Sequence, residues 1–499
     1  MSDLFRYIFQ DAYLAKFMLP DAARERLDRL DPRWWVASAQ LIAFFWGGAL
    51  LSPLFNPVPA SLQPFGWLIG LLMSAGIVFL GVGELLRFFP PRRSLMLLIL
   101  ATGLAMRLFM SWAPPVLEVD YQRYLWDGAV SASGENPYRL APADIAGRPA
   151  PRLQALYRQS QGLPDRINHG HLTTVYPPLT QAFFALAYQI RPFSPGAWKA
   201  ILYLADLITL LLIFAILKRL GRSPTWAALY WLNPLLIKEM FNSAHMDLLV
   251  FPFLMAAILW AISDRHLLAM VFLSAATAVK LWPVILAPIF LKMLWPRWRQ
   301  LLTATAVFGL LTLTLLAPML LTGLGSGSGL ATYGETWHNN DSLHKLLRWG
   351  YEHYLTFRDI HPGHARAKAR TAILVLMGIW VVIQTFQFSG RKEELADRLL
   401  LVSAALFLLS PTQFPWYACW LAPLLALQPR RPLLAISALL PLYYLRFYFE
   451  GRGETDFFEN WLVWLEFAPV WVWILRDYWQ RKRYNRPYST EVAVGYEIQ

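Results

Sequence analysis

Long apolar stretches separated by short polar turns dominate the chain, and they predict a bundle of membrane-spanning helices. A transmembrane helix needs roughly 20 mostly apolar residues, and fewer where it is broken. By this criterion we expect about 13–14 spans. The candidate segments are 36–53, 66–88, 95–113, 198–218, 224–241, 247–262, 267–279, 281–294, 300–321, 371–388, 397–411, 415–428, 432–448 and 461–475. The predicted fold class is an all-α polytopic membrane protein.

Composition supports the same class. Of the 499 residues, 57% are hydrophobic and only 15% are charged, whereas soluble domains carry about 25% charged residues. The single cysteine, Cys419, excludes a disulfide scaffold. A net charge of +13 would suggest nucleic acid as a partner of a soluble protein. In a membrane protein it indicates basic loops on the cytoplasmic side instead, so we expect no nucleic acid.

The positions of Lys and Arg predict the orientation. Basic residues recur at alternating turns: Arg87, Arg92, Arg93, Lys218, Arg219, Arg222, Lys292, Arg297, Arg299, Arg391, Lys392, Arg430 and Arg431. All of them fall on the cytoplasmic side if the amino terminus is cytoplasmic and a short apolar segment at about 176–190 re-enters the membrane without crossing it. The outward loops are then about 114–197, 322–370 and 449–460, and we expect helices in these loops.

The pattern predicts one integral domain with two polar ends. Residues 1–34 contain Asp11, Asp21, Glu25 and Asp28, which do not fit a cleavable signal peptide. We expect a cytoplasmic or interfacial amphipathic segment there. Residues 35–475 form the membrane domain, and 476–499 form a basic cytoplasmic tail.

Lys280 stands out among the ionisable residues in apolar segments. Such residues cost about 2.5–3.5 kcal/mol at mid-membrane and are functional candidates. Pro283 interrupts the surrounding apolar stretch, and Arg265 and Lys292 flank it on the same predicted side. The chain must therefore rise, turn near Lys280 and descend. A lysine at the tip of such a hairpin suits a lipid-linked phosphate, and snorkelling of a structural lysine is the alternative.

The first outward loop contains a cluster of acidic residues. Glu118 and Asp120 are two positions apart, and a helix that begins near Asp120 places Asp120, Arg123 and Asp127 on one face. A carboxylate at a membrane–water boundary is suited to act as a general base. The alternative is a self-paired, solvated helix start.

A second polar cluster follows further along the chain. Tyr176 precedes two prolines at the start of the re-entrant segment, and Asn242, His245 and Asp247 lie at the outer end of a span that also contains Glu239. Polar side chains between apolar helices are costly unless they meet a polar ligand or water. The histidines at 169 and 171 lack further ligands at a suitable spacing, so we expect no zinc site.

Six motifs occur in one order: the acidic pair, NPY, YPPL, WKxxxxxxD, NPxxIKExxNSAHxD and AVKLWPV. In this order they resemble the GT-C superfamily of glycosyltransferases, which use polyprenol-phosphate sugars. The chain is similar to bacterial polyprenol-phosphate-mannose-dependent mannosyltransferases and to the catalytic subunit of GPI mannosyltransferase I. The resemblance runs from about Glu118 to Pro288 and more loosely to Trp420. It implies a GT-C-like bundle.

The resemblance also implies roles for individual residues. Asp120 takes the position of the catalytic base beside Glu118, and Lys280 takes the donor phosphate. In the mechanism that we expect, Arg446 assists Lys280 there. The substrate site is expected to include Arg123, Asp127, Tyr176, Asn242, His245, Asp247 and Trp416. Bacterial members often have a His where this chain has Phe414. If that His contacts phosphate, another group must replace it here: His338, His344 or Arg446.

These features predict an inverting hexosyltransferase of the bacterial inner membrane, with its active site on the outer, periplasmic face. Its partners would be a polyprenyl-phosphate-linked sugar, such as mannose, a glycolipid or glycan acceptor, and the lipid bilayer. No cofactor is required, although a divalent cation stays possible. The alternatives are a flippase for lipid-linked oligosaccharides, which the intramembrane charges also fit, and a polymerase or ligase of surface glycans.

Overall fold

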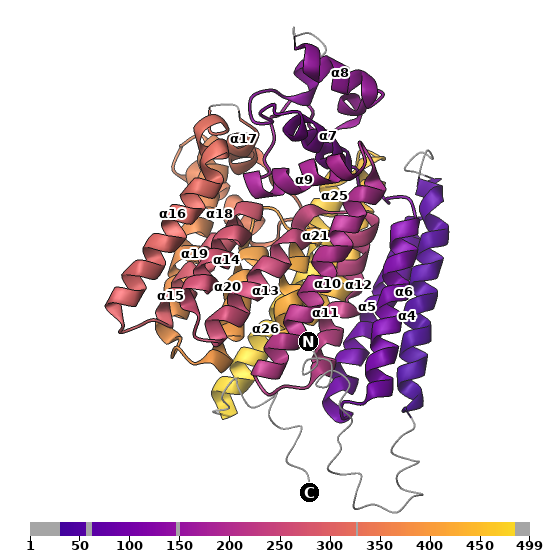
Figure 1. Cartoon of the computed structure of the whole chain (residues 1–499), viewed down its shortest axis with the longest axis vertical. Coiled ribbons are helices and arrows are strands. Elements are labelled where there is room, and N and C mark those ends of the chain that lie inside the picture. Colours follow the sequence, from indigo (N-terminus) through magenta and orange to yellow (C-terminus); the bar gives the residue numbers. More distant parts are fainter. Residues whose placement is uncertain (1–29, 56–61, 146–149, 326–327, 485–499) are drawn as a thin grey trace, which may run out of the picture. The chain divides into compact units, whose positions relative to one another are not determined.

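The computed structural model describes residues 30–55, 62–145, 150–325 and 328–484, which fold almost entirely into helices (Figure 1). No strand occurs in these ranges, and an isolated bridge pairs Asn339 with Thr412. The predicted all-α class is therefore confirmed. The amphipathic segment predicted at the amino terminus lies, up to residue 29, outside the described residues, as do residues 485–499 of the predicted tail.

Seven helices in the described part of the chain are long and apolar enough to cross a membrane. They are Pro32–Phe55, Phe65–Phe88, Arg93–Trp112, Pro195–Arg219, Trp298–Thr322, Ala365–Gln387 and Arg431–Glu450. A bent pair, Pro234–Asn242 with Met246–Ile262, would make an eighth span, and its two halves meet at 106°. The chain is thus a multi-pass membrane protein.

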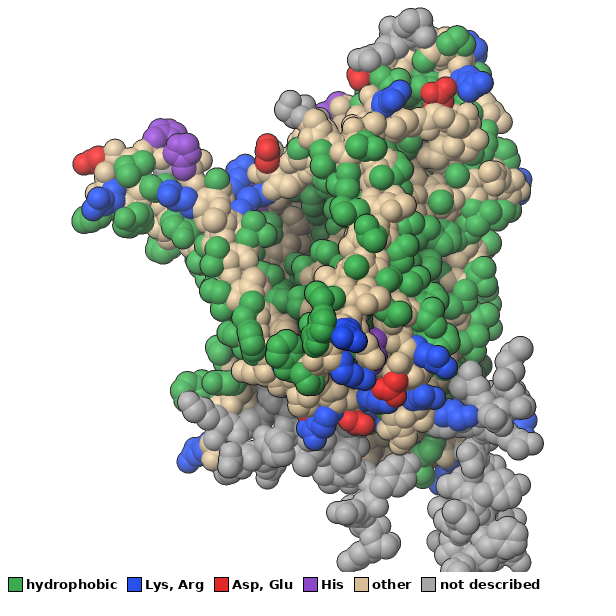
Figure 2. Space-filling view, turned by 60° about the vertical axis from the view of Figure 1, so that its left-hand side comes forward, with side chains coloured by type: hydrophobic (Ala, Val, Ile, Leu, Met, Phe, Trp, Pro, Cys, Tyr) green, Lys and Arg blue, Asp and Glu red, His purple; other side chains and the backbone are tan. Residues whose placement is uncertain are grey.

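This number is lower than the 13 or 14 spans expected from the sequence. Several predicted spans are short helices: His266–Val279, Trp282–Lys292 and Pro415–Leu427 have fewer than 18 residues. Hydropathy depends only on which residues a segment contains. It therefore does not distinguish a continuous membrane-spanning helix from a short or broken one. On the face drawn in Figure 2, hydrophobic side chains form a broad band, and Lys and Arg side chains gather at its lower margin.

The chain divides into two compact units, each built from segments that are distant in sequence. Unit 1 takes its described residues from Met1–Pro114, Leu210–Lys238 and Phe414–Gln499. Unit 2 consists of Pro115–Thr209 and Glu239–Gln413. Helix α10 (Pro195–Arg219) contributes to both.

Unit 1 is a packed group of apolar helices. Its helices are α4 (Pro32–Leu51), α5 (Phe65–Phe88), α6 (Arg93–Trp112), α11 (Ala228–Trp231), α12 (Pro234–Ile237), α21 (Pro415–Ala418), α22 (Ala422–Leu427), α23 (Arg431–Leu439), α24 (Leu445–Glu450), α25 (Thr455–Phe457) and α26 (Val463–Tyr484). Arg107 is fully buried and donates to the carbonyls of Gly103 and Trp231 at 3.0 and 2.6 Å. Its guanidinium also lies 3.6 Å from the ring centre of Trp231. These contacts give this intramembrane arginine a structural role.

Unit 2 contains the segments in which the sequence predicts the site. Its helices are α7 (Asp120–Ala132), α8 (Pro151–Gln159), α9 (Pro178–Ile190), α13 (Val250–Ile262), α14 (His266–Val279), α15 (Ala287–Lys292), α16 (Trp298–Thr322), α17 (Gly329–Thr336), α18 (Leu343–Phe357), α19 (Ala365–Gln387) and α20 (Lys392–Leu409). Helix α7 begins at Asp120, as the spacing predicts, and α9 begins at a proline in its first turn. Helix α14 ends at Val279, so the predicted break before Pro283 is also present.

Helices α7 and α9 pack closely because Gly128 has no side chain. A Cβ atom at this position would lie 2.3 Å from the carbonyl oxygen of Phe184. Backbone atoms cannot move aside as a flexible side chain can, so only glycine permits this approach. The contact holds α7, whose first residue is Asp120, against α9.

We expect Gly128→Ala to destabilise the protein by about 1–3 kcal/mol, because the added methyl forces α7 away from α9. Thermal unfolding in detergent measures the effect. Gly309→Ala in α16 is the matched control, because a Cβ there meets no atom within 4 Å. Equal unfolding temperatures for the two variants would show that α7 and α9 are not held at this distance.

Candidate active site

The acidic pair lies at the junction between an extended segment and α7. Glu118 accepts hydrogen bonds through Oε1 from the backbone amides of Val119 and Asp120, at 3.1 and 3.2 Å. Its carboxylate therefore holds the start of α7 in place. The preceding residue, Leu117, has a φ of +58°, a conformation that is strained for a branched side chain. Asp120 lies in the first turn of the helix and is partly buried.

His245 joins this junction to the bend between the two halves of the broken span. Its ring is fully buried, with Nε2 3.6 Å from Glu118 Oε2 and 3.4 Å from Glu239 Oε2. Its Nδ1 lies 3.4 Å from the hydroxyl of Tyr124 on α7. One nitrogen of the imidazole thus faces two carboxylates that are 121 positions apart in sequence. The backbone bends sharply just before it, since Ala244 has a φ of +58°.

Two further hydrogen bonds fix the bend. The side-chain oxygen of Asn242 accepts from the amide of Val116 at 2.9 Å, which ties the bend to the segment before Glu118. The indole of Trp198 donates to the carbonyl of Ala244 at 2.8 Å. Asn242 therefore positions backbone in this structure, and its predicted contact with substrate stays a prediction.

Lys280 forms an ion pair with Asp247 at the break after α14. Lys280 is in extended conformation, and the carbonyl of Val279 accepts a hydrogen bond of 2.6 Å from Thr180 on α9. The Asp247 side chain is 2% exposed, whereas that of Lys280 is 19% exposed. The pair therefore has a buried acidic member and a more accessible cation. Such a cation is available to an anionic ligand.

Four charged neighbours act electrostatically on the carboxyl group of Asp120: Glu118, His245, Lys280 and Asp247. Burial raises the pKa of Asp120 to about 7, and the neighbouring charge of Glu118 acts in the same direction, as Asp247 does more weakly. The charges of His245 and Lys280 oppose the shift. Residues that are distant in sequence are therefore gathered around one carboxylate whose proton affinity suits general-base catalysis near neutral pH.

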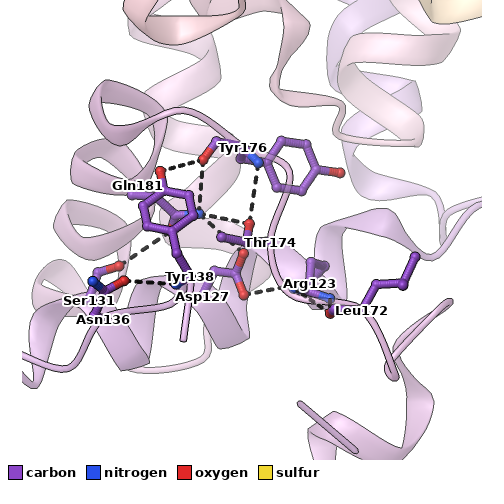
Figure 3. Close-up of polar contacts among 9 residues, drawn as sticks. All are labelled: Arg123, Asp127, Ser131, Asn136, Tyr138, Leu172, Thr174, Tyr176 and Gln181. Carbon is purple, nitrogen blue, oxygen red and sulfur yellow. Dashed lines mark hydrogen bonds and ion pairs between the residues drawn. The ribbon is translucent and has the colours of Figure 1, made fainter. Parts of the chain in front are cut away.

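Arg123 and Asp127 take part in a separate polar network, which Figure 3 shows. Arg123 Nε donates to Asp127 Oδ1 at 2.9 Å, and its terminal nitrogens donate to the carbonyl of Leu172 at 3.1 Å. The amide of Gln181 on α9 donates to Asp127 Oδ2 at 3.2 Å and to Thr174 at 3.0 Å. These contacts bind the segment 172–176 to α7 and α9. Arg123 and Asp127 are thus paired with each other, as in the alternative considered from the sequence, but both are buried and not solvated.

Tyr176 ends this segment. Its carbonyl accepts a hydrogen bond of 2.7 Å from Tyr138, and Figure 3 shows its ring pointing away from the network. The ring packs edge-on against Tyr124 and Phe184, with centroids 5.1 and 5.6 Å apart. The aromatic contact with Tyr124 connects Tyr176 to the helix that carries Asp120.

Two predicted residues, Arg446 and Trp416, belong to unit 1. Arg446 lies in α24, and Trp416 is stacked on Phe414 with ring centroids 4.2 Å apart. Phe414 also packs edge-on against Tyr443 at 6.2 Å, so the residue that replaces the expected histidine is part of an aromatic cluster. The assignment of Arg446 to the donor phosphate and of Trp416 to the sugar stays a prediction.

Sequence reasoning missed some members of the site. Tyr124 was not a candidate, although it is four positions from Asp120 and thus on the same face of α7. The sequence identified Glu239 only as an acidic residue within an apolar segment. Within the described ranges, no group of three or more His, Cys, Asp or Glu side chains is arranged to hold a metal ion.

The pKa of Asp120 predicts a pH dependence. Its carboxylate is the active form of a general base, so kcat/KM should fall as the pH drops below about 7, by about tenfold per pH unit. Glu118→Gln removes the adjacent negative charge that raises this pKa, so the acidic limb should move to lower pH. Initial rates between about pH 5 and pH 9 measure both effects. Glu135→Gln is the control, and an unshifted limb in Glu118→Gln would contradict the coupling.

Residues 41–297 match the model of a protein family described as alpha-(1->6)-mannopyranosyltransferase, N-terminal domain. The match covers just over half of the chain and includes the acidic pair, the bend at His245 and the break at Lys280. No curated protein sequence matches the chain, and neither does any solved structure.

Proposed function

Because the chain belongs to the alpha-(1->6)-mannopyranosyltransferase family, a GT-C-type family of mannosyltransferases, we propose that it transfers mannose from a polyprenyl-phosphate donor. The acceptor is a hydroxyl group of a glycolipid or glycan at the outer face of the membrane. The reaction inverts the configuration at the anomeric carbon. Mannosyltransferase activity in general follows from the family, and the donor, the acceptor and the membrane face are our proposal.

One observation carries this proposal most strongly. Asp120 has a pKa of about 7 and interacts electrostatically with both members of the Lys280–Asp247 ion pair. This ion pair lies at the break after a short apolar helix. A general base and a cation are the two groups that glycosyl transfer from a phosphate donor requires. A break in an apolar helix is also where a lipid-linked phosphate and its hydrocarbon tail are best accommodated together.

The proposed reaction is a single displacement. Asp120 accepts the proton of the acceptor hydroxyl while the oxygen attacks the anomeric carbon of mannose. The bond between that carbon and the phosphate oxygen breaks, and its electron pair remains on the phosphate. Lys280 stabilises the charge that develops there. Attack from the face opposite to the leaving phosphate inverts the configuration, and no glycosyl-enzyme intermediate forms.

The remaining residues position these groups. Glu118 orients the start of α7 through its bonds to the amides of Val119 and Asp120. Arg123 and Asp127 hold the segment 172–176, so we assign them to the framework of the sugar site. Catalysis depends on such positioning because small displacements of reacting groups reduce the rate strongly.

The purified full-length protein tests the proposal. It is given polyprenyl-phosphate mannose carrying labelled mannose together with a membrane glycolipid extract, and a parallel reaction contains GDP-mannose. We expect label to pass to the extract from the lipid donor alone, with one polyprenyl phosphate released per mannose transferred. NMR of the product should show the anomer opposite to that of the donor. Transfer from GDP-mannose alone, or retention of configuration, would overturn the proposal.

A further inference from the structure

Helix α18 (Leu343–Phe357) presents an apolar stripe that no other part of the described chain covers. Leu346, Trp349 and Phe357 are 48%, 58% and 85% exposed and lie at helical spacings of three, eight and eleven residues on one face. Tyr354 at the side of this stripe is 56% exposed. On the surface of a soluble protein, exposed apolar side chains are usually scattered singly. Four large ones on a single helix are more than such a surface normally has.

The opposite face of α18 is firmly attached to the protein. His344 is fully buried and its Nδ1 lies 2.5 Å from a carboxylate oxygen of Asp341. The amide and hydroxyl of Ser342 both donate to Gln413 Oε1, at 2.8 and 3.0 Å. Leu355 is buried near the other end of the helix. The exposed stripe is therefore held in a fixed orientation, and it is not the result of a loosely placed helix.

Positive charge accompanies the stripe. Residues 343–370, which we name the α18–α19 arm, contain six Lys or Arg and two carboxylates. Glu352 is partly neutralised by Arg348 at 3.6 Å. The side chains of Arg358, Arg366 and Lys368 are exposed. An apolar helical face bordered by basic residues is the composition of helices that lie at the surface of anionic membranes.

The arm leads directly into a helix that is long, apolar and largely exposed. Helix α19 begins at Ala365 and is a candidate membrane span with only 22% of its apolar window buried. Its exposed apolar side chains include Leu374 (72%) and Phe386 (78%). Helix α18, which carries the stripe, therefore leads into a candidate membrane span whose apolar surface is largely exposed.

We propose that the α18–α19 arm lies in the head-group layer of the membrane and binds anionic phospholipid there. Leu346, Trp349 and Phe357 enter the boundary of the acyl chains, where burial of their surface is favourable. Arg358, Arg366 and Lys368 contact lipid phosphates from the polar side. Under the proposed topology these basic residues are on the outer face, where they do not serve the positive-inside rule, so lipid binding gives them a separate role.

Site-directed labelling tests the position of the stripe. Cys419 is the single cysteine and is buried, so Cys419→Ser provides a background for single labelling sites. A bimane label is attached in Phe357→Cys and in Arg152→Cys, since the Arg152 side chain on α8 is 75% exposed. In liposomes we expect nitroxide-bearing lipids to quench the label at 357, and aqueous iodide to quench the label at 152. Equal iodide quenching at both positions overturns the proposal, and so does protection of 357 from both quenchers, which indicates a protein partner.

A charge variant tests the lipid preference. Arg358→Gln/Arg366→Gln/Lys368→Gln removes three charges from the arm. The control, Arg152→Gln/Arg158→Gln/Arg166→Gln, removes three exposed charges from another predicted outward loop, 114–197. Each protein is reconstituted with phosphatidylcholine and fluorescent phosphatidylglycerol, whose enrichment around the protein is measured by energy transfer. We expect the arm variant to lose enrichment by roughly fivefold per charge removed, and the control to lose none. Equal enrichment in both variants overturns the proposal.

Discussion

Asp120→Asn should reduce mannose transfer by about 10²–10⁴-fold, which is the usual contribution of a general base. Asparagine keeps the shape of the side chain but cannot accept the proton of the acceptor hydroxyl. The protein should remain folded. Burial disfavours the charged form of Asp120 and raises its pKa from 3.8 to about 7. The folded state therefore loses stability as the pH rises between these values, and the neutral amide avoids this loss.

The combination of lost activity and unchanged or raised thermal stability identifies a functional residue. Transfer is measured with saturating donor and acceptor, and unfolding is followed in the same detergent. Asp144→Asn is the matched control, since Asp144 is an exposed acid of the same outward loop. A variant that keeps more than about a tenth of the wild-type rate would exclude Asp120 as the base.

Lys280→Met should have the second large effect, and it should act on both stability and activity. Methionine keeps most of the volume but removes the cation paired with buried Asp247, which costs about 3–5 kcal/mol when a buried ion pair loses one member. Transfer should fall by about 10²–10³-fold because the charge on the leaving phosphate is no longer stabilised.

A double variant separates the two roles of Lys280. In Lys280→Met/Asp247→Asn the buried carboxylate is also neutral, so most of the lost stability should return. Activity should stay low, since neither substitution restores a cation for the donor phosphate. Recovery of both stability and transfer in the double variant would show that Lys280 has only a structural role.

The sequence allowed the class of the fold and its local breaks to be predicted, because these depend on patterns within short windows. The spacing of Asp120, Arg123 and Asp127 predicted the start of α7, and the basic residues that flank Lys280, together with Pro283, predicted the end of α14. The number of continuous spans was overestimated. An apolar run such as 267–279 has the hydropathy of a span but is only 14 residues long as a helix, His266–Val279.

Partners of the charged residues were harder to predict, because pairing depends on tertiary structure. The sequence marked His245 as a polar residue at the end of an apolar segment. Only the fold shows that the carboxylates of Glu118 and Glu239 both lie close to its Nε2 atom. Asp127 is predicted to contact substrate, and only the fold shows that its two oxygens accept hydrogen bonds from Arg123 and Gln181. The position of a charged residue in the sequence does not show which residue it pairs with in the folded protein.

The residues with positive φ beside the site have a consequence for engineering. Ala244 adopts a φ of +58° immediately before His245, and Leu117 does so before Glu118. Glycine relieves such strain, so a screen for yield or heat resistance would favour Ala244→Gly. The same substitution widens the range of conformations open to the backbone that aims the imidazole. Selection for stability alone would thus reduce catalytic turnover through this position. A directed-evolution experiment therefore needs to measure stability and transfer activity from its first round.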